Sequence, residues 1–143
     1  MREILFRGKR VFDSEWIYGD LIKSEEKFYI HPQRNLVEVN KSIGNKIVMH
    51  EVIPETVGQY IGLRDIDDVK IFEGDIIQHI VHKDKYKLIY DEDEYVYNLK
   101  RLEGKGYLYL GIDEFSIYEE DGRNVIFKVT DNIYDTSELL EVE

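Results

Sequence analysis

The chain has 143 residues, a formal charge of −11 and no cysteine. It is long enough for one domain with its own core, and it can form neither disulfide bonds nor thiolate metal sites. No stretch approaches the roughly 18 apolar residues of a membrane-spanning helix, and the basic start has too short an apolar run for a signal peptide. We therefore expect a cytoplasmic protein with no membrane segment, and the lack of cysteine agrees with a reducing compartment.

Short apolar runs alternate with turn residues along the whole chain, which is typical of many short strands. In the first part we expect strands at residues 3–7, 16–21, 27–31, 36–39 and 46–50, and one helical turn at Pro54-Glu55-Thr56. In the second part we expect strands at residues 75–81, 85–90, 95–100, 107–110, 115–118, 124–129 and 132–134, and a closing turn at 137–140. Eleven tyrosines, six phenylalanines and no alanine also favour strands over helices.

These elements predict an all-β fold of short antiparallel strands within a single domain, residues 1–143. We expect an N-terminal β portion, residues 1–60, packed on a C-terminal SH3-like barrel, residues 61–143. Three residues are assigned structural roles in the stretch that joins the two portions: Gly62, Gly74 and Asp75. Gly74 is expected at positive φ in a corner, Asp75 is expected to bind the backbone of that corner, and Gly62 indicates a bulge or a close backbone approach.

The charge is unevenly distributed along the chain. Residues 1–60 hold nine Lys or Arg and nine Asp or Glu, whereas residues 61–143 hold ten and twenty-one, so the second part carries the entire −11. Such a surface repels a phosphate backbone, which argues against direct binding of nucleic acid. The acidic surface can serve solubility alone, or it can dock a basic partner or the cluster Arg2, Arg7, Lys9 and Arg10 of a neighbouring subunit.

Tyrosines recur on the predicted strands of the second part. Alternation places Tyr86 with Tyr90, Tyr95 with Tyr97, and Tyr107 with Tyr109, each pair on one side of its strand. If the three strands pair in sequence, these six residues form one aromatic patch. The patch is either ordinary cross-strand packing or a candidate interaction surface, since tyrosine is enriched at interfaces.

Few residues suggest catalysis or metal binding. His79 and His82 have HxxH spacing, but on a straight strand they point to opposite faces and cannot chelate together without a bend. The acidic run of residues 91–94 lacks the ligand pattern of a calcium loop and is typical of a solvated hairpin turn. No nucleophile elbow or phosphate loop is present in the sequence, so no catalytic, cofactor or metal-binding residue is assigned.

Blocks of turn and core residues follow one another along the chain: REI at residues 2–4, FR at 6–7, TVGQYIGLRD at 56–65, IFEGDII at 71–77, NIY at 132–134 and ELL at 138–140. In this order they resemble the YopX family of phage and prophage proteins. The sequence departs from the family at the middle turn, where Ile66 and Asp68 replace an Asn-Gly type of turn. Because Asp tolerates left-handed backbone, we expect a turn to remain there. The resemblance implies barrel-like all-β parts, a phage or prophage origin and a homo-oligomer such as a ring, and it implies no established activity.

The sequence therefore predicts a non-enzymatic module, encoded by a phage or prophage, that self-assembles and binds a host or phage protein in the bacterial cytoplasm. Two alternatives remain open. The first is an acidic decoy that imitates DNA and occupies a host nucleic-acid enzyme. The second is a small hydrolase that uses clustered acids and a metal ion.

Overall fold

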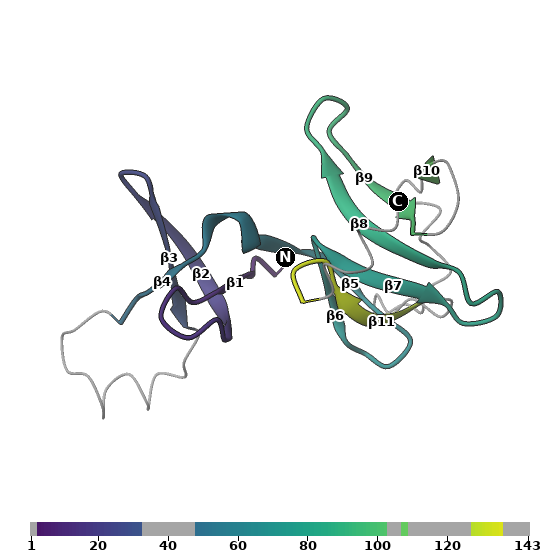
Figure 1. The fold of residues 1–143 in the computed structure, drawn as a ribbon, viewed down its shortest axis with the longest axis horizontal. Helices are drawn as coiled ribbons and strands as arrows, with labels where there is room; N and C mark the ends of the chain where they lie inside the picture. Colours follow the sequence, from purple (N-terminus) through teal and green to yellow (C-terminus); the bar gives the residue numbers. More distant parts are fainter. Residues whose placement is uncertain (1–2, 33–47, 103–106, 109–126, 136–143) are drawn as a thin grey trace. The chain divides into compact units, whose positions relative to one another are not determined.

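The computed structural model of the chain describes residues 3–32, 48–102, 107–108 and 127–135. These residues form an all-β structure of antiparallel strands (Figure 1). The chain divides into two compact units, Met1–Tyr60 and Ile61–Glu143. Strand β5 (Gly58–Arg64) begins in the first unit and ends in the second. None of the described residues belongs to a helix long and apolar enough to span a bilayer.

The first unit is a sheet of short strands in which one edge strand also pairs with the residue after the first strand. Its strands are β1 (Phe6–Lys9), β2 (Trp16–Ser24), β3 (Lys27–Pro32), β4 (His50–Val52) and the start of β5, with the 3-10 turn η1 (Pro54–Thr56) between the last two. The order across the sheet is β4-β3-β2-β1-β5. Strand β4 and the residue after it also form hydrogen bonds with the end of β1 and the turn that follows. Val11 N donates to Glu51 O at 3.0 Å, and Ile53 N donates to Lys9 O at 2.8 Å. This double attachment fixes the turn after β1 against β4.

The second unit contains the end of β5, β6 (Lys70–Phe72), β7 (Asp75–His79), β8 (Lys85–Asp91), β9 (Val96–Arg101), β10 (Tyr107–Leu108) and β11 (Phe127–Asn132). Strand β6 lies beside β5, and the other five form a second sheet in the order β10-β9-β8-β7-β11. One hydrophobic core joins residues of both sheets: Ile61, Leu63, Ile71, Ile77, Tyr86, Leu88, Leu99 and Phe127. The alternation of apolar residues in β5, β7 and β8 therefore faces a shared interior.

Most of the predicted strands that fall on described residues are present, with shifted ends, but strands β5 and β6 were not predicted. Of the described residues in the strand expected at 46–50, only His50 lies in a strand, at the start of β4. The first strand begins at Phe6 instead of residue 3, although Leu5 O still accepts a hydrogen bond from Tyr60 N at 2.8 Å. Strand β7 ends at His79 instead of residue 81, and Ile133 lies in a turn after β11 instead of in a separate strand. The helical turn at residues 54–56 is confirmed as η1. The strands expected at residues 36–39 and 115–118 lie outside the described residues.

The fold is confirmed as two antiparallel sheets. Among the described residues the five-stranded sheet is open, with β10 and β11 at its two edges. The strand pairs in this part of the chain therefore do not close a barrel.

Candidate functional site

The corner before β7 has the geometry that the sequence predicts. Gly74 has φ +88°, and a Cβ placed on it would lie 2.9 Å from Cε2 of Tyr134. Its N–H donates to Leu88 O at 2.8 Å. The buried carboxylate of Asp75 accepts a hydrogen bond from Phe72 N at 2.7 Å. Gly62 also has a positive φ, of +89°. These residues shape the backbone, and the carboxylate is already engaged by the corner.

The carboxylate of Asp65, like that of Asp75, has a structural role, which the sequence did not indicate. Its side chain is fully buried. One oxygen, Oδ1, accepts hydrogen bonds from the N–H groups of Asp67 and Val69 at 2.8 and 2.9 Å, and Oδ2 accepts one from Val129 N at 2.8 Å. Asp68 takes a left-handed φ of +67°, so the turn expected at residues 64–68 is confirmed. The first two bonds are the local pattern of an Asx turn, but no sequence signal indicates a bond to Val129, 64 residues away.

His79 and His82 lie side by side, which corrects the expectation that they face opposite ways. The chain bends directly after His79, where β7 ends, and the two ring centroids are 4.5 Å apart. His79 Nδ1 accepts hydrogen bonds from Val81 N and His82 N at 3.2 and 3.1 Å. Burial, with a smaller effect from His82, lowers the pKa of His79, and Asp84 opposes the shift. Within the described ranges no group of three His, Asp or Glu side chains is placed to hold a metal ion.

The structure brings together only some of the six tyrosines. Tyr86 is 6% exposed and packs edge-on against Phe127 in the core. Tyr90 and Tyr97 are paired across β8 and β9, with ring centroids 5.1 Å apart. Tyr95 lies in the turn between these strands. Tyr107, in β10, pairs with Lys100 of β9, and Tyr109 lies outside the described residues. The pairing therefore gathers Tyr90 and Tyr97, with Tyr95 beyond them at the end of the hairpin.

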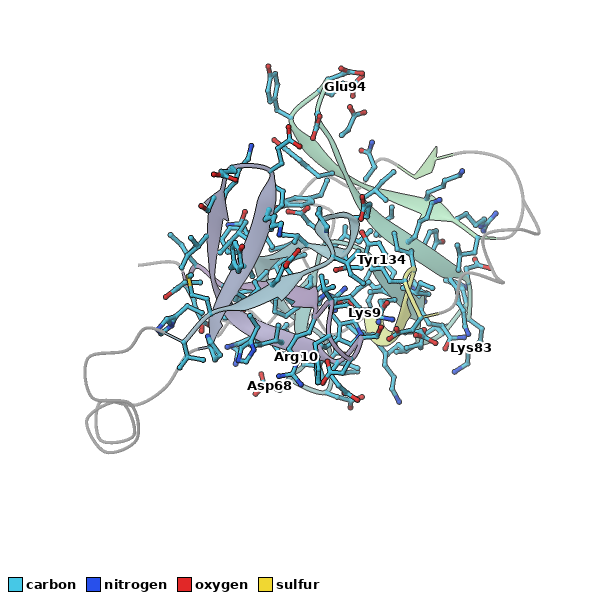
Figure 2. All side chains as sticks on the ribbon, turned by 60° about the vertical axis from the view of Figure 1, so that its left-hand side comes forward. Lys9, Arg10, Asp68, Lys83, Glu94 and Tyr134 are labelled. Carbon is cyan, nitrogen blue, oxygen red and sulfur yellow. The ribbon has the colours of Figure 1, made fainter. Side chains whose placement is uncertain are left out.

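The turn between β8 and β9 presents an aromatic side chain beside four acids. Asp91 Oδ1 accepts hydrogen bonds from Asp93 N and Glu94 N, at 2.9 and 3.2 Å, and Tyr95 N donates to Asp91 O at 2.8 Å. The acidic run is thus confirmed as a hairpin turn. Tyr95 is 80% exposed and has φ +59°, a left-handed conformation that is strained for a bulky residue. Figure 2 shows Glu94 at the tip of this hairpin, with side chains projecting around it.

The first unit contains a cavity that the sequence analysis missed. It has a volume of about 480 Å³ and is lined by Arg10, Val11, Phe12, His50 and Glu51. Phe12 is 93% exposed and Val11 is also exposed. The cavity lies between the turn after β1 and strand β4, which are about 40 residues apart in sequence and are joined by the bond from Val11 to Glu51. A run of two apolar residues, Val11-Phe12, in a turn is the only sequence signal for it.

The basic residues at the end of β1 and directly after it are held in defined positions. Arg10 forms an ion pair with Asp13, and the hydrogen bond from Arg10 holds the pKa of that carboxyl below its usual value. Arg7 and Lys9 lie over the ring of Trp16, with the guanidinium carbon and the ammonium nitrogen 4.7 and 5.5 Å from its centroid. Arg7 is buried, so the expected surface cluster of four basic residues is in part internal to the unit.

The described residues thus define an all-β protein of two antiparallel sheets, in which the buried carboxylates Asp65 and Asp75 hold turns and exposed aromatics lie on two turns. Comparison with protein-family models matches residues 5–141 to the YopX protein family. The chain therefore belongs to the YopX family, which confirms the resemblance seen in its motifs. A comparison with curated proteins found no match.

Proposed function

We propose that this protein is a non-enzymatic module that self-assembles into a homo-oligomer and binds a partner protein. The observation that carries this proposal is the exposure of Phe12 and Tyr95, at 93% and 80%, on two separate turns. Each side chain gains little buried area within its own unit, and Tyr95 also has a left-handed backbone. Aromatic side chains kept exposed in this way are characteristic of protein interfaces.

Two further features support binding over catalysis. The buried carboxylates of Asp65 and Asp75 accept backbone hydrogen bonds in turns, so both serve the fold. His79 Nδ1 accepts two backbone N–H groups, which occupies the nitrogen nearest the bend. These three groups, which are of the kinds used in acid–base chemistry, are thus committed to structure.

The finer aspects of the architecture and setting are part of the same proposal. We propose that the second unit has the architecture of a partly open SH3-like barrel, because strands of both sheets pack around one core. The YopX membership and the absence of cysteine support a phage or prophage protein that acts in the bacterial cytoplasm. In this setting a ring is one form that the oligomer can take, and the bound partner is a host or phage protein.

Sedimentation velocity at micromolar concentration, in low and in high salt, tests the assembly. We expect a species larger than the monomer, with a salt-dependent fraction because charges contribute to the contact. A monomer under both conditions would remove the proposal.

The acidic decoy is a second candidate, favoured by the run of exposed carboxylates at Glu92, Asp93 and Glu94 and by the charge of −11 in residues 61–143. A decoy requires a basic, DNA-binding cleft in its target. Pulldown from host lysate would then recover nucleic-acid enzymes that elute as the salt concentration rises. Recovery of no such enzyme from the lysate would argue against it.

A further inference from the structure

The exposed ring of the tyrosine at the β8–β9 hairpin contributes little to its own unit. Tyr95 has a left-handed backbone, which glycine or asparagine adopts with less strain, and its ring is 80% exposed. Lys83 takes the same backbone conformation in the β7–β8 turn, with φ +66°, so the turn accounts for the backbone and the exposed aromatic ring is the feature that the fold does not use. An exposed aromatic side chain on a turn points to a role outside the folded unit.

The cavity of the first unit matches such a side chain in size and character. Its volume of about 480 Å³ lies in the range of pockets that enclose a small organic group. Val11 and Phe12 supply apolar surface, and Arg10, His50 and Glu51 supply polar groups around it. An aromatic ring buried there would contact Phe12 in place of water, which is favourable for both side chains.

Charge decides which surface of this chain the hairpin can approach. Its turn carries four consecutive acids, Asp91, Glu92, Asp93 and Glu94. Residues 61–143 of another copy carry the whole net charge of −11 and repel this turn, whereas residues 1–60 are neutral in sum. The cavity itself is lined by one cationic side chain, Arg10 (labelled in Figure 2), which is paired with Asp13. The first unit of a second copy is therefore the electrostatically compatible part.

We propose that Tyr95 of one copy docks in the cavity formed by Arg10, Val11, Phe12, His50 and Glu51 of a second copy. This inference rests on the proposed self-assembly and names its contact surfaces. The two surfaces are different, so the contact is head-to-tail. Repetition of such a contact closes a ring or extends a filament, depending on the rotation between copies.

Complementary variants test the contact in the full-length protein. Tyr95→Asn removes the ring while keeping a residue suited to left-handed backbone, and Phe12→Asp places a charge at the cavity. Each variant alone is expected to weaken assembly at least about tenfold, as for loss of an interface hot spot. In a mixture of the two, Phe12→Asp still has Tyr95 and Tyr95→Asn still has the intact cavity. Sedimentation of the mixture should therefore show a one-to-one dimer and no larger species. Val81→Asn, which changes an exposed apolar residue in another turn, is the matched control and should assemble as the unmodified chain does.

The outcomes separate this inference from the proposed function. If the unmodified chain assembles and Tyr95→Asn assembles equally well, the docking contact is wrong and self-assembly stands. If the unmodified chain is monomeric, self-assembly itself is wrong.

Photo-crosslinking identifies the occupant of the cavity directly and does not depend on the stability of a variant. A benzoylphenylalanine introduced at position 95 in expressing cells should crosslink to the peptide that contains Val11 and Phe12 of a second copy. Crosslinking only to a different protein would overturn the inference.

Discussion

At the scale of single residues, backbone conformation explains more of this protein than side-chain chemistry does. Gly74 has φ +88° and packs against Tyr134. Both the backbone conformation and the close contact therefore require a residue without a side chain. Asp75 accepts a hydrogen bond from the backbone N–H of Phe72 at this corner. Both roles were predicted from the order Glu73-Gly74-Asp75 because turn chemistry is local.

Replacing Gly74 with valine should lower the free energy of unfolding by more than about 1 kcal/mol, because a β-branched residue is strained at this φ. Chemical denaturation measures the loss. Gly74→Asn is the matched control: it meets the same ring of Tyr134 but tolerates left-handed backbone, so it should lose less. Equal losses would show that crowding alone, and not φ, is responsible.

His79 should make stability depend on pH. Its pKa is lowered in the folded state, chiefly by burial, relative to about 6.5 in an unfolded chain. The unfolded state therefore binds the proton more readily, and the contribution of His79 to stability is present above about pH 6.5 and is lost as pH falls through the folded pKa. Protonation would also remove the acceptor for Val81 N and His82 N.

Denaturation of the unmodified chain and of His79→Gln, followed between about pH 8 and pH 5, measures this contribution. The variant should have a flatter dependence of stability on pH than the unmodified chain. Identical curves for the two proteins would contradict the assignment.

At the scale of elements, the sequence predicts most strands, misses β5 and β6, and places strand ends less well. Alternation in residues 85–90 correctly places Tyr86 and Tyr90 on one side of β8. Their partners across β9 are Arg101 and Tyr97, respectively. The bend at His79 was missed because Ile80-Val81 continues an apolar pattern while the chain already turns. The cavity was missed because it joins a turn and a strand far apart in sequence, which no local pattern encodes.

Asp65 connects elements across the second unit, so its loss should affect the whole unit. Asp65→Asn leaves an amide NH₂ facing either Val129 N or the turn N–H groups, and one buried donor then lacks an acceptor. We expect a loss of about 1–3 kcal/mol in the free energy of unfolding. The control is Asp67→Asn in the same turn, whose exposed carboxylate lies 3.7 Å from Lys128 Nζ. It should change stability by less than about 0.5 kcal/mol, and an equal loss from both variants would contradict the role of Asp65.

At the scale of the whole molecule, the sequence separates a neutral first part from an acidic second part, and the chain forms two compact units. Family membership followed from ordered motifs, since YopX-type blocks recur from one end of the chain to the other. The interaction surfaces did not follow from these motifs. Phe12 and Tyr95 lie on turns outside every family block, and their exposure is evident only once the chain is folded.

The central claim is that the exposed aromatic side chains of Phe12 and Tyr95, on two turns of an all-β fold, serve self-assembly. Light scattering of the intact chain during size-exclusion chromatography at micromolar concentration tests it most directly, because molar mass is read without assumptions about shape. The account predicts a mass that is a multiple of the monomer mass and that falls toward one monomer in Tyr95→Asn. A monomer mass for the unmodified chain would contradict it.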